Sequence, residues 1–248
     1  MTTSQNIIAH LIELRKRLLY SVVALLLVFV ALFPWAADLY ALLAQPLLAK
    51  LPQGGQMIAT EVTTPFFVPV KVALMTAFLI SLPYILYQIW SFVAPGLYTH
   101  EKRWVVPLVV ASMLLFLSGM AFAYFAVFPM VFGFVTASAP KGVAVMTDID
   151  KYLSFVMSMF LAFGVTFQVP VAVVAMVKMG FVSIAKLREI RRYVIVGAFI
   201  AGAILTPPDV VSQFMLALPL WLLYEAGIWV AVWMIRKPKA ESADVEKT

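Results

Sequence analysis

The sequence contains no cysteine and very few charged residues. The absence of cysteine excludes a disulfide framework, a thiol nucleophile and a Cys-ligated metal. Only 12% of the 248 residues are charged and 64% are hydrophobic, whereas soluble globular chains carry roughly a quarter charged residues. A soluble domain of this length could not hide so much apolar surface, so we expect an integral membrane protein.

Signatures of catalysis and of metal binding are absent as well. No H-E-x-x-H, G-x-S-x-G, P-loop or Gly-rich dinucleotide motif occurs. His10 and His100 have no carboxylate or cysteine cluster at metal spacing, and both are expected to be surface residues. We therefore expect no enzyme activity, no metal and no cofactor. The net charge of +6 is explained by basic loops that set membrane topology and face anionic lipid, so we expect lipid and not nucleic acid as a partner.

Long apolar segments fill almost the whole chain. A spanning helix needs about 20 apolar residues to cross a hydrocarbon core of about 30 Å, and we expect an all-α polytopic fold with six transmembrane helices. The spans are predicted at about 18–37, 71–93, 104–132, 152–177, 193–206 and 210–235. We expect one domain over residues 1–236 and a disordered tail at 237–248. The first span exceeds the usual signal-peptide core and is expected to be retained.

Prolines divide the spans. The segment between the first two spans holds Pro46, Pro65 and Pro69 and is predicted to be a loop. Pro83 lies inside the second predicted span, and Pro170 is predicted to interrupt the fourth. No internal repeat is visible, which argues against an inverted-repeat transporter.

Lysine and arginine alternate between abundant and scarce from loop to loop. Fourteen of the eighteen lie in the N-terminus, in the second and fourth loops and in the tail. The other four are Lys50, Lys71, Lys141 and Lys151. The positive-inside rule therefore predicts that both termini are cytoplasmic. The fifth span, with about 24 Å of helix, is unusually short, so either neighbouring helices shield it or the membrane is thin there.

Two polar side chains are predicted within the membrane. Gln168 and Glu225 each lie about ten residues from a cytoplasmic helix end, so both are expected about 15 Å deep. They could line one polar niche that contacts a partner or substrate. Equally, each could satisfy a polar group of a neighbouring helix.

Two acidic residues, Glu13 and Glu101, stand among basic residues at the predicted cytoplasmic border. Either carboxylate could pair locally, as Glu13 could with Lys16 or Arg17, and such exposed pairs contribute only about 0–1 kcal/mol. Alternatively, each could accept the arginine of a partner in a stronger and more directional contact. Charge alone favours local pairing.

Several motifs together give a resemblance that covers nearly the full length. They are His10-Leu-Ile-Glu-Leu-Arg-Lys-Arg-Leu18, Pro65-Phe66-Phe67, Trp90-Ser-Phe-Val-Ala-Pro-Gly-Leu-Tyr98 with Glu101-Lys-Arg103, Phe122-Ala-Tyr-Phe125 and Thr206-Pro-Pro-Asp209. With these motifs the chain resembles the TatC family, the polytopic core of the twin-arginine protein translocase.

The resemblance implies a receptor for export signals that carry consecutive arginines. It also implies transport of folded proteins across the bacterial cytoplasmic (inner) membrane, with single-span TatA/TatB-type subunits in an oligomeric complex driven by the proton-motive force. The signal-binding residues that it implies are Glu13, Arg15, Leu18, Phe92 and Glu101. Pro46 and Asp209 match positions associated with translocation on the far side, and Thr206 falls where the family docks its single-span partners.

One departure concerns Gln168, where family members often carry glutamate. Any mechanism that needs an ionisable group there is in doubt for this chain. Two other functions compete with the receptor. A small-solute secondary transporter would use Gln168 and Glu225 as its midplane site, and an intramembrane enzyme is disfavoured by the missing nucleophile–base set.

Overall fold

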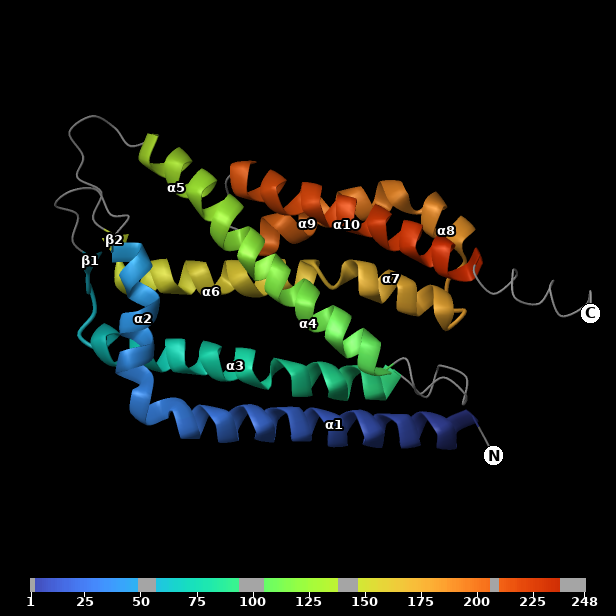
Figure 1. Ribbon diagram of the computed structural model, residues 1–248, viewed down its shortest axis with the longest axis horizontal. Coiled ribbons are helices and arrows are strands. Elements are labelled where there is room, and N and C mark those ends of the chain that lie inside the picture. Colours follow the sequence, from blue (N-terminus) through green and yellow to red (C-terminus); the bar gives the residue numbers. More distant parts are fainter. Residues whose placement is uncertain (1–2, 49–56, 94–104, 138–146, 206–209, 237–248) are drawn as a thin grey trace, which may run out of the picture. The chain divides into compact units, whose positions relative to one another are not determined.

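The computed structural model describes residues 3–48, 57–93, 105–137, 147–205 and 210–236 (Figure 1). Within these ranges the chain is helical apart from one short strand pair, which confirms the all-α prediction. The elements are α1 (Thr3–Leu32), the 3-10 helix η1 (Phe33–Trp35), α2 (Ala36–Leu48), β1 (Met57–Ile58), α3 (Thr64–Val93), α4 (Val105–Phe122), the π-helix η4 (Ala123–Val127), α5 (Phe128–Ala137), β2 (Thr147–Asp148), α6 (Ile149–Thr166), α7 (Val169–Lys178), α8 (Ile184–Glu189), α9 (Arg191–Leu205) and α10 (Val210–Arg236).

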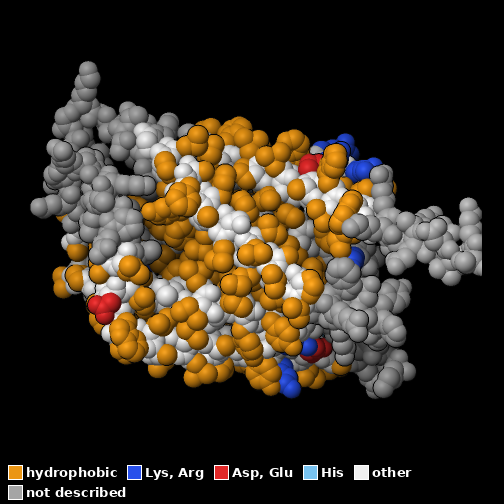
Figure 2. All heavy atoms as spheres, viewed as in Figure 1, with side chains coloured by type: hydrophobic (Ala, Val, Ile, Leu, Met, Phe, Trp, Pro, Cys, Tyr) orange, Lys and Arg blue, Asp and Glu red, His pale blue; other side chains and the backbone are white. Residues whose placement is uncertain are grey.

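Five stretches of the described chain are long and apolar enough to cross a membrane. They are Ile8–Leu42, Thr64–Val93, Val106–Val131, Ile149–Lys178 and Ser212–Met234. The remaining predicted span, the fifth, is α9, whose 15 residues reach only about 22 Å, in agreement with the short fifth span that the sequence predicts. Figure 2 shows hydrophobic side chains over most of the described surface in that view, with the charged ones near its margins.

The predicted helix boundaries near three prolines were wrong. The helix α2 continues through Pro46, and α3 begins at Thr64, so Pro65 and Pro69 lie in helix and not in a loop. Pro65 stands in the first turn, where a backbone N–H would have no helical partner, and Pro69 removes one bond close to the helix start. The prolines therefore do little harm at these places.

The structure also corrects the predicted limits of two basic segments. The basic N-terminus is continuous with the first predicted span in α1, which begins at Thr3. The basic loop before α9 contains α8, whose N-cap Ser183 accepts a hydrogen bond from the backbone N–H of Lys186 (3.2 Å). By contrast, the predicted break at Pro170 is confirmed, because α6 ends at Thr166 and α7 begins at Val169. The predicted disordered tail lies outside the described residues.

The described chain divides into two compact units, and the division falls inside α4 and α6. The first unit holds α1, η1, α2, α3, both strands and the first parts of α4 and α6, and the second holds the rest. The prediction of one domain stays a prediction.

The core of the first unit joins α2, α3 and α6. Val68, Val72 and Leu153 are buried there, with Leu39 and Tyr40 packed against them. At the other end of α3, the indole N–H of Trp90 donates to the hydroxyl of Ser112 (2.9 Å) in a buried contact. That bond joins the first half of α4 to α3.

The core of the second unit joins α7, α8 and α10. Val173, Leu187, Tyr224 and Ile228 are buried together, and the hydroxyl of Tyr224 donates to the carbonyl of Leu187 (2.8 Å). This bond satisfies a carbonyl of the short helix α8, so α8 is held by both packing and polar contact.

Candidate functional site

The first turns of α1 lie beside the last turns of α3, and both helices belong to the first unit (Figure 1). Two side-chain contacts define this place. The His10 ring stacks on the Phe92 ring, with centroids 4.2 Å apart and planes at 21°. Further along, Nη1 of Arg17 donates to Oε1 of Gln88 (3.3 Å). Residues more than seventy positions apart in sequence thus form one surface, which we call the α1–α3 site.

Glu13 lies in this site and is already paired. The Nε and Nη2 atoms of Arg17 donate to its Oε1 at 2.9 and 2.6 Å. The side chains of Arg17 and Glu13 are 25% and 34% exposed, so solvent reaches both. The local ion pair that charge alone favours is therefore present in the structure.

The other implied signal-binding residues divide into two groups. Phe92 lies in the α1–α3 site, in contact with His10. Arg15 and Leu18 are exposed, and helical geometry places them about 160° and 140° around α1 from Glu13. Glu101, Thr206 and Asp209 lie outside the described residues, so their predicted roles stay predictions. Pro46 lies in the last turn of α2.

Sequence reasoning missed part of this site. Gln88 was not singled out, although a buried amide in an otherwise apolar helix signals a specific polar contact. His10 was interpreted as a plain surface residue, yet it stacks on Phe92. Arg17 was considered only as one possible neighbour of Glu13, and it also links α1 to α3 through Gln88.

The two predicted intramembrane polar residues belong to the second unit. A Cβ added at Gly227 would lie 2.9 Å from Cα of Pro170, so α7 and α10 touch there, and both run in the same direction (Figure 1). Gln168 and Glu225 each stand two residues before that contact, which is consistent with a common depth. Glu225 is not an open acceptor, because Nη2 of Arg191 donates to its Oε2 (2.6 Å).

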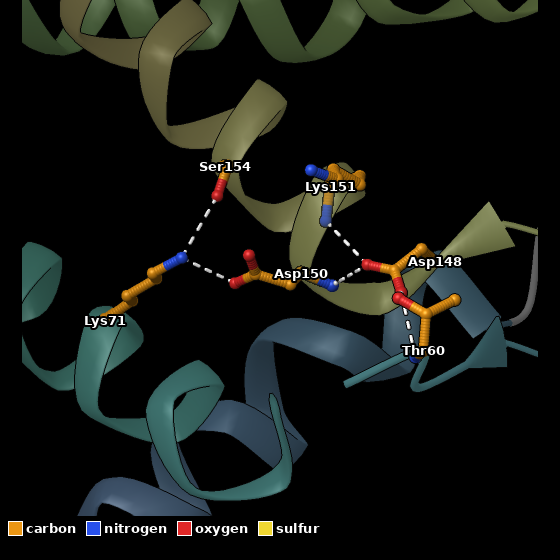
Figure 3. Close-up of polar contacts among 6 residues, drawn as sticks. All are labelled: Thr60, Lys71, Asp148, Asp150, Lys151 and Ser154. Carbon is orange, nitrogen blue, oxygen red and sulfur yellow. Dashed lines mark hydrogen bonds and ion pairs between the residues drawn. The ribbon is translucent and has the colours of Figure 1, made fainter. Parts of the chain in front are cut away.

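Figure 3 shows a third polar cluster, which lies in the first unit. It includes Lys71, near the start of α3, whereas the α1–α3 site lies near the end of that helix. Nζ of Lys71 contacts Oδ1 of Asp150 (2.5 Å) and Oγ of Ser154 (3.3 Å). Asp148 accepts bonds from the hydroxyl and the backbone N–H of Thr60. These contacts join α3, the strand pair and the start of α6, so this cluster is a structural tie.

Asp148 also caps α6, because its Oδ1 accepts the backbone N–H groups of Asp150 and Lys151, both at 2.9 Å. These bonds favour the ionised carboxylate. The hydroxyl of Thr60, followed by the backbone N–H of Lys151, lowers the pKa of Asp148 from 3.8 to about 2. The carboxylate of Asp148 therefore stays ionised in the folded protein at a pH where it would be protonated in the unfolded chain.

This lowered pKa gives a pH prediction. Because the folded value lies below the unfolded one, the contribution of Asp148 to stability is present above pH 3.8 and is lost as the pH falls toward about 2. The NMR signal of the Thr60 amide should titrate with a midpoint near pH 2, and Thr60→Val should move that midpoint toward 3.8. An Asp148→Asn control should show no such titration. A midpoint of 3.8 with Thr60 intact would contradict the hydrogen-bonded arrangement.

Comparison with known proteins gives one consistent result. The profile of the family described as "Sec-independent protein translocase protein (TatC)" matches residues 9–219. The chain is 54% identical over 234 residues to the protein of that name from Escherichia coli (strain K12), with 94% of this chain and 91% of the relative covered. The relative of the same name from Aquifex aeolicus (strain VF5) is 38% identical over 232 residues, with 93% and 96% covered.

Solved structures agree with this result. The structure described as "Crystal Structure of Twin Arginine Translocase Receptor- TatC" matches with a TM-score of 0.79 and 39% identity, covering 90% of this chain and 98% of that one. The match includes the polytopic helical fold, so the six-span prediction is consistent with it. The family profile, the curated relatives and the solved structure together show that the chain belongs to the TatC family of Sec-independent protein translocase proteins.

Proposed function

We propose that this chain is the receptor subunit of a twin-arginine translocase and binds signal peptides with consecutive arginines at the α1–α3 site. Its family is one of protein translocase components and not of enzymes. The name of a structural relative at 39% identity, a twin-arginine translocase receptor, supports the receptor role. The excess of basic residues near the N-terminus favours a cytoplasmic orientation of the site.

The observation that carries this proposal is the bonding of Glu13. Its carboxylate accepts two N–H groups of a guanidinium, at 2.9 and 2.6 Å, and it remains about one third exposed. The site therefore has the geometry and the access that recognition of an arginine from another chain requires. Arginine is preferred over lysine for such contacts because its planar fork donates several N–H groups in fixed directions.

Recognition of two arginines needs a second acceptor, and we propose Glu101 for that role on the basis of its motif. The apolar part of a signal peptide would lie along α1. The most apolar part of the stretch Ile8–Leu42 has no residue buried inside the protein. Leu18, 61% exposed, stands on that open surface. Single-span TatA/TatB-type partners, with Thr206 in their docking region, would complete an oligomeric complex in the bacterial cytoplasmic membrane. The proton-motive force would drive transport through that complex, for which Pro46 and Asp209 are needed on the far side.

The transporter alternative has less support. Its proposed midplane acceptor, Glu225, is bonded to Arg191 at 2.6 Å and its side chain is 20% exposed, against 34% for Glu13, so a solute has less access to Glu225 than a signal peptide has to Glu13. Gln168 precedes α7 as its N-cap residue and offers an amide in place of a charge. We propose for both residues a role in contacts among helices or with a partner helix.

Binding of a photo-reactive twin-arginine signal peptide tests the receptor proposal. Glu13→Gln and Glu101→Gln should each weaken binding about tenfold or more, because a hydrogen bond to a charged group contributes about 1.5–3 kcal/mol. Glu101→Lys should weaken binding further through repulsion between like charges. A peptide with paired lysines should bind worse than the paired-arginine peptide.

Glu189→Gln is the matched control. Glu189 is an exposed acidic residue paired with Lys186 at 3.0 Å, and it lies in a basic segment predicted on the same side of the membrane. This control should bind the peptide normally. Normal binding by the Glu13→Gln/Glu101→Gln variant, at wild-type abundance, would rule the proposal out.

A further inference from the structure

We propose that Arg17 is a built-in occupant of the Glu13 carboxylate, which an arginine of the arriving signal peptide displaces. This inference rests on the receptor proposal and adds a control element to it. Arg17 carries the same guanidinium group as the ligand, and it already holds the oxygen that the ligand would approach. The empty site is thus kept in a closed state by a residue of the chain itself.

The geometry explains how Arg17 is held. Nε and Nη2 donate to Oε1 of Glu13 on α1, and Nη1 donates to Oε1 of Gln88 on α3 at 3.3 Å. Gln88 is 7% exposed, so packing restricts the movement of its side-chain amide. Once Glu13 is taken by a ligand, Arg17 can keep its bond to Gln88. Displacement therefore needs no buried charge to be left unpaired.

The geometry also explains why a ligand can succeed. Both N–H groups of Arg17 converge on the same oxygen, Oε1, so neither of these bonds uses Oε2. An arginine from another chain can approach from solvent and bond both oxygens in the forked arrangement, which is the stronger one. A partly exposed ion pair between residues four apart contributes only a factor of about two to five in an equilibrium constant.

The consequence is a threshold for binding. An internal occupant reduces the fraction of receptor that is open, and the apparent Kd of every ligand rises by the same factor. The ratio between paired-arginine and paired-lysine peptides is unchanged. At a fixed peptide concentration, however, weak basic sequences fall below useful occupancy while a strong ligand still binds. Arg17 thereby keeps the site from filling with incidental basic segments.

Whether substitution of Arg17 tightens or weakens peptide binding tests this inference. Arg17→Gln should tighten binding of the paired-arginine peptide about two- to fivefold, and of the paired-lysine peptide by the same factor. Arg17→Lys keeps the charge but lacks the fork, so it should give a smaller increase. If Arg17 merely positioned Glu13 for the ligand, both substitutions would weaken binding.

The loss of a positive charge at position 17 must be distinguished from the release of the Glu13 carboxylate. Lys16 is the matched control, because it is an exposed neighbour of Arg17 that lies over the ring of Tyr20, 5.7 Å from its centroid. Lys16→Gln removes the same charge without opening Glu13 and should tighten binding less than Arg17→Gln does. The increase caused by Arg17→Gln should also disappear in a Glu13→Gln background, where no carboxylate is left to uncover.

The failure of the Arg17 proposal and the failure of the receptor proposal give different results. Weaker binding by Arg17→Gln, an increase no larger than that of Lys16→Gln, or an undiminished increase in the Glu13→Gln background would overturn the occupant role. If Glu13→Gln alone leaves peptide binding unchanged, the receptor proposal itself fails. Thermal unfolding of each variant in detergent accompanies the binding measurement, so that a folding defect is recognised as such.

Discussion

Replacement of Gly119 by leucine should prevent the accumulation of folded protein. A Cβ at this position would lie 2.5 Å from the carbonyl oxygen of Phe163 and 2.9 Å from its carbonyl carbon. Both are backbone atoms of α6, which cannot move aside as a side chain can. Since small residues allow membrane helices to approach closely, leucine would force α4 and α6 apart at Gly119, which is buried.

The expected loss is about 3 kcal/mol or more in the free energy of unfolding, at the upper end of the range for overpacked cores. Thermal unfolding in detergent and abundance in the membrane measure it. Gly197→Leu is the control, because nothing lies within 4 Å of a Cβ at Gly197 and that position is exposed. Equal stability of the two leucine variants would show that the approach of α4 to α6 is not needed.

The number and the places of the spans could be predicted because each depends on local composition. An apolar stretch of sufficient length has few alternatives to a membrane helix, and Pro170 breaks α7 from α6 because proline removes a helical bond. The beginning of α3 could not be predicted in the same way. Proline ends a helix because it lacks a backbone N–H, but in a first turn that N–H has no helical partner, so proline is tolerated there. Pro65 stands in the first turn of α3.

The candidate site was predictable only in part, and for a physical reason. The Glu13–Arg17 pair is local, four residues apart on one helix, so the sequence contains it. The bond of Arg17 to Gln88 depends on which face of α3 meets α1, and an almost uniformly apolar helix carries no periodic pattern from which to deduce that face. The same holds for Lys71 and Asp150, which packing of α3 against α6 brings to 2.5 Å.

Glu225 illustrates the same limit. The sequence shows a carboxylate inside a membrane helix, yet its partner Arg191 lies 34 residues earlier, at the start of α9. Because Arg191 was assigned to the basic loop, the pairing was not foreseen. Of the two alternatives that the sequence left open for Glu225, the structure favours contact with a polar group of a neighbouring helix, because Glu225 is one half of an ion pair with Arg191.

This ion pair leads to the second large expected effect. Glu225→Leu should destabilise the protein by about 2–3 kcal/mol, because it leaves Arg191 without its carboxylate. Among the described residues the Nε atom of Arg191 is already buried without a hydrogen-bond partner, so little remains to compensate its charge. The size of the effect is limited because the Arg191 side chain is 43% exposed and can turn toward lipid headgroups.

The reverse change should be milder. Arg191→Leu leaves a carboxyl group, which can become neutral by taking up a proton, whereas a guanidinium cannot lose its charge. The variant with leucine at both positions should recover most of the stability, since replacing both partners of an ion pair with apolar residues is often neutral. Thermal unfolding of the three variants in detergent measures this order.

Export activity of the double-leucine variant then separates structure from mechanism. If Glu225 serves only to neutralise Arg191, the double variant should transport a twin-arginine substrate normally, while Glu225→Leu alone should lose activity in proportion to its loss of folded protein. If the double variant is stable but inactive, the carboxylate at 225 acts in transport itself. In that case the α7–α10 region, where Pro170 meets Gly227, would have to be counted as part of the working site together with the α1–α3 site.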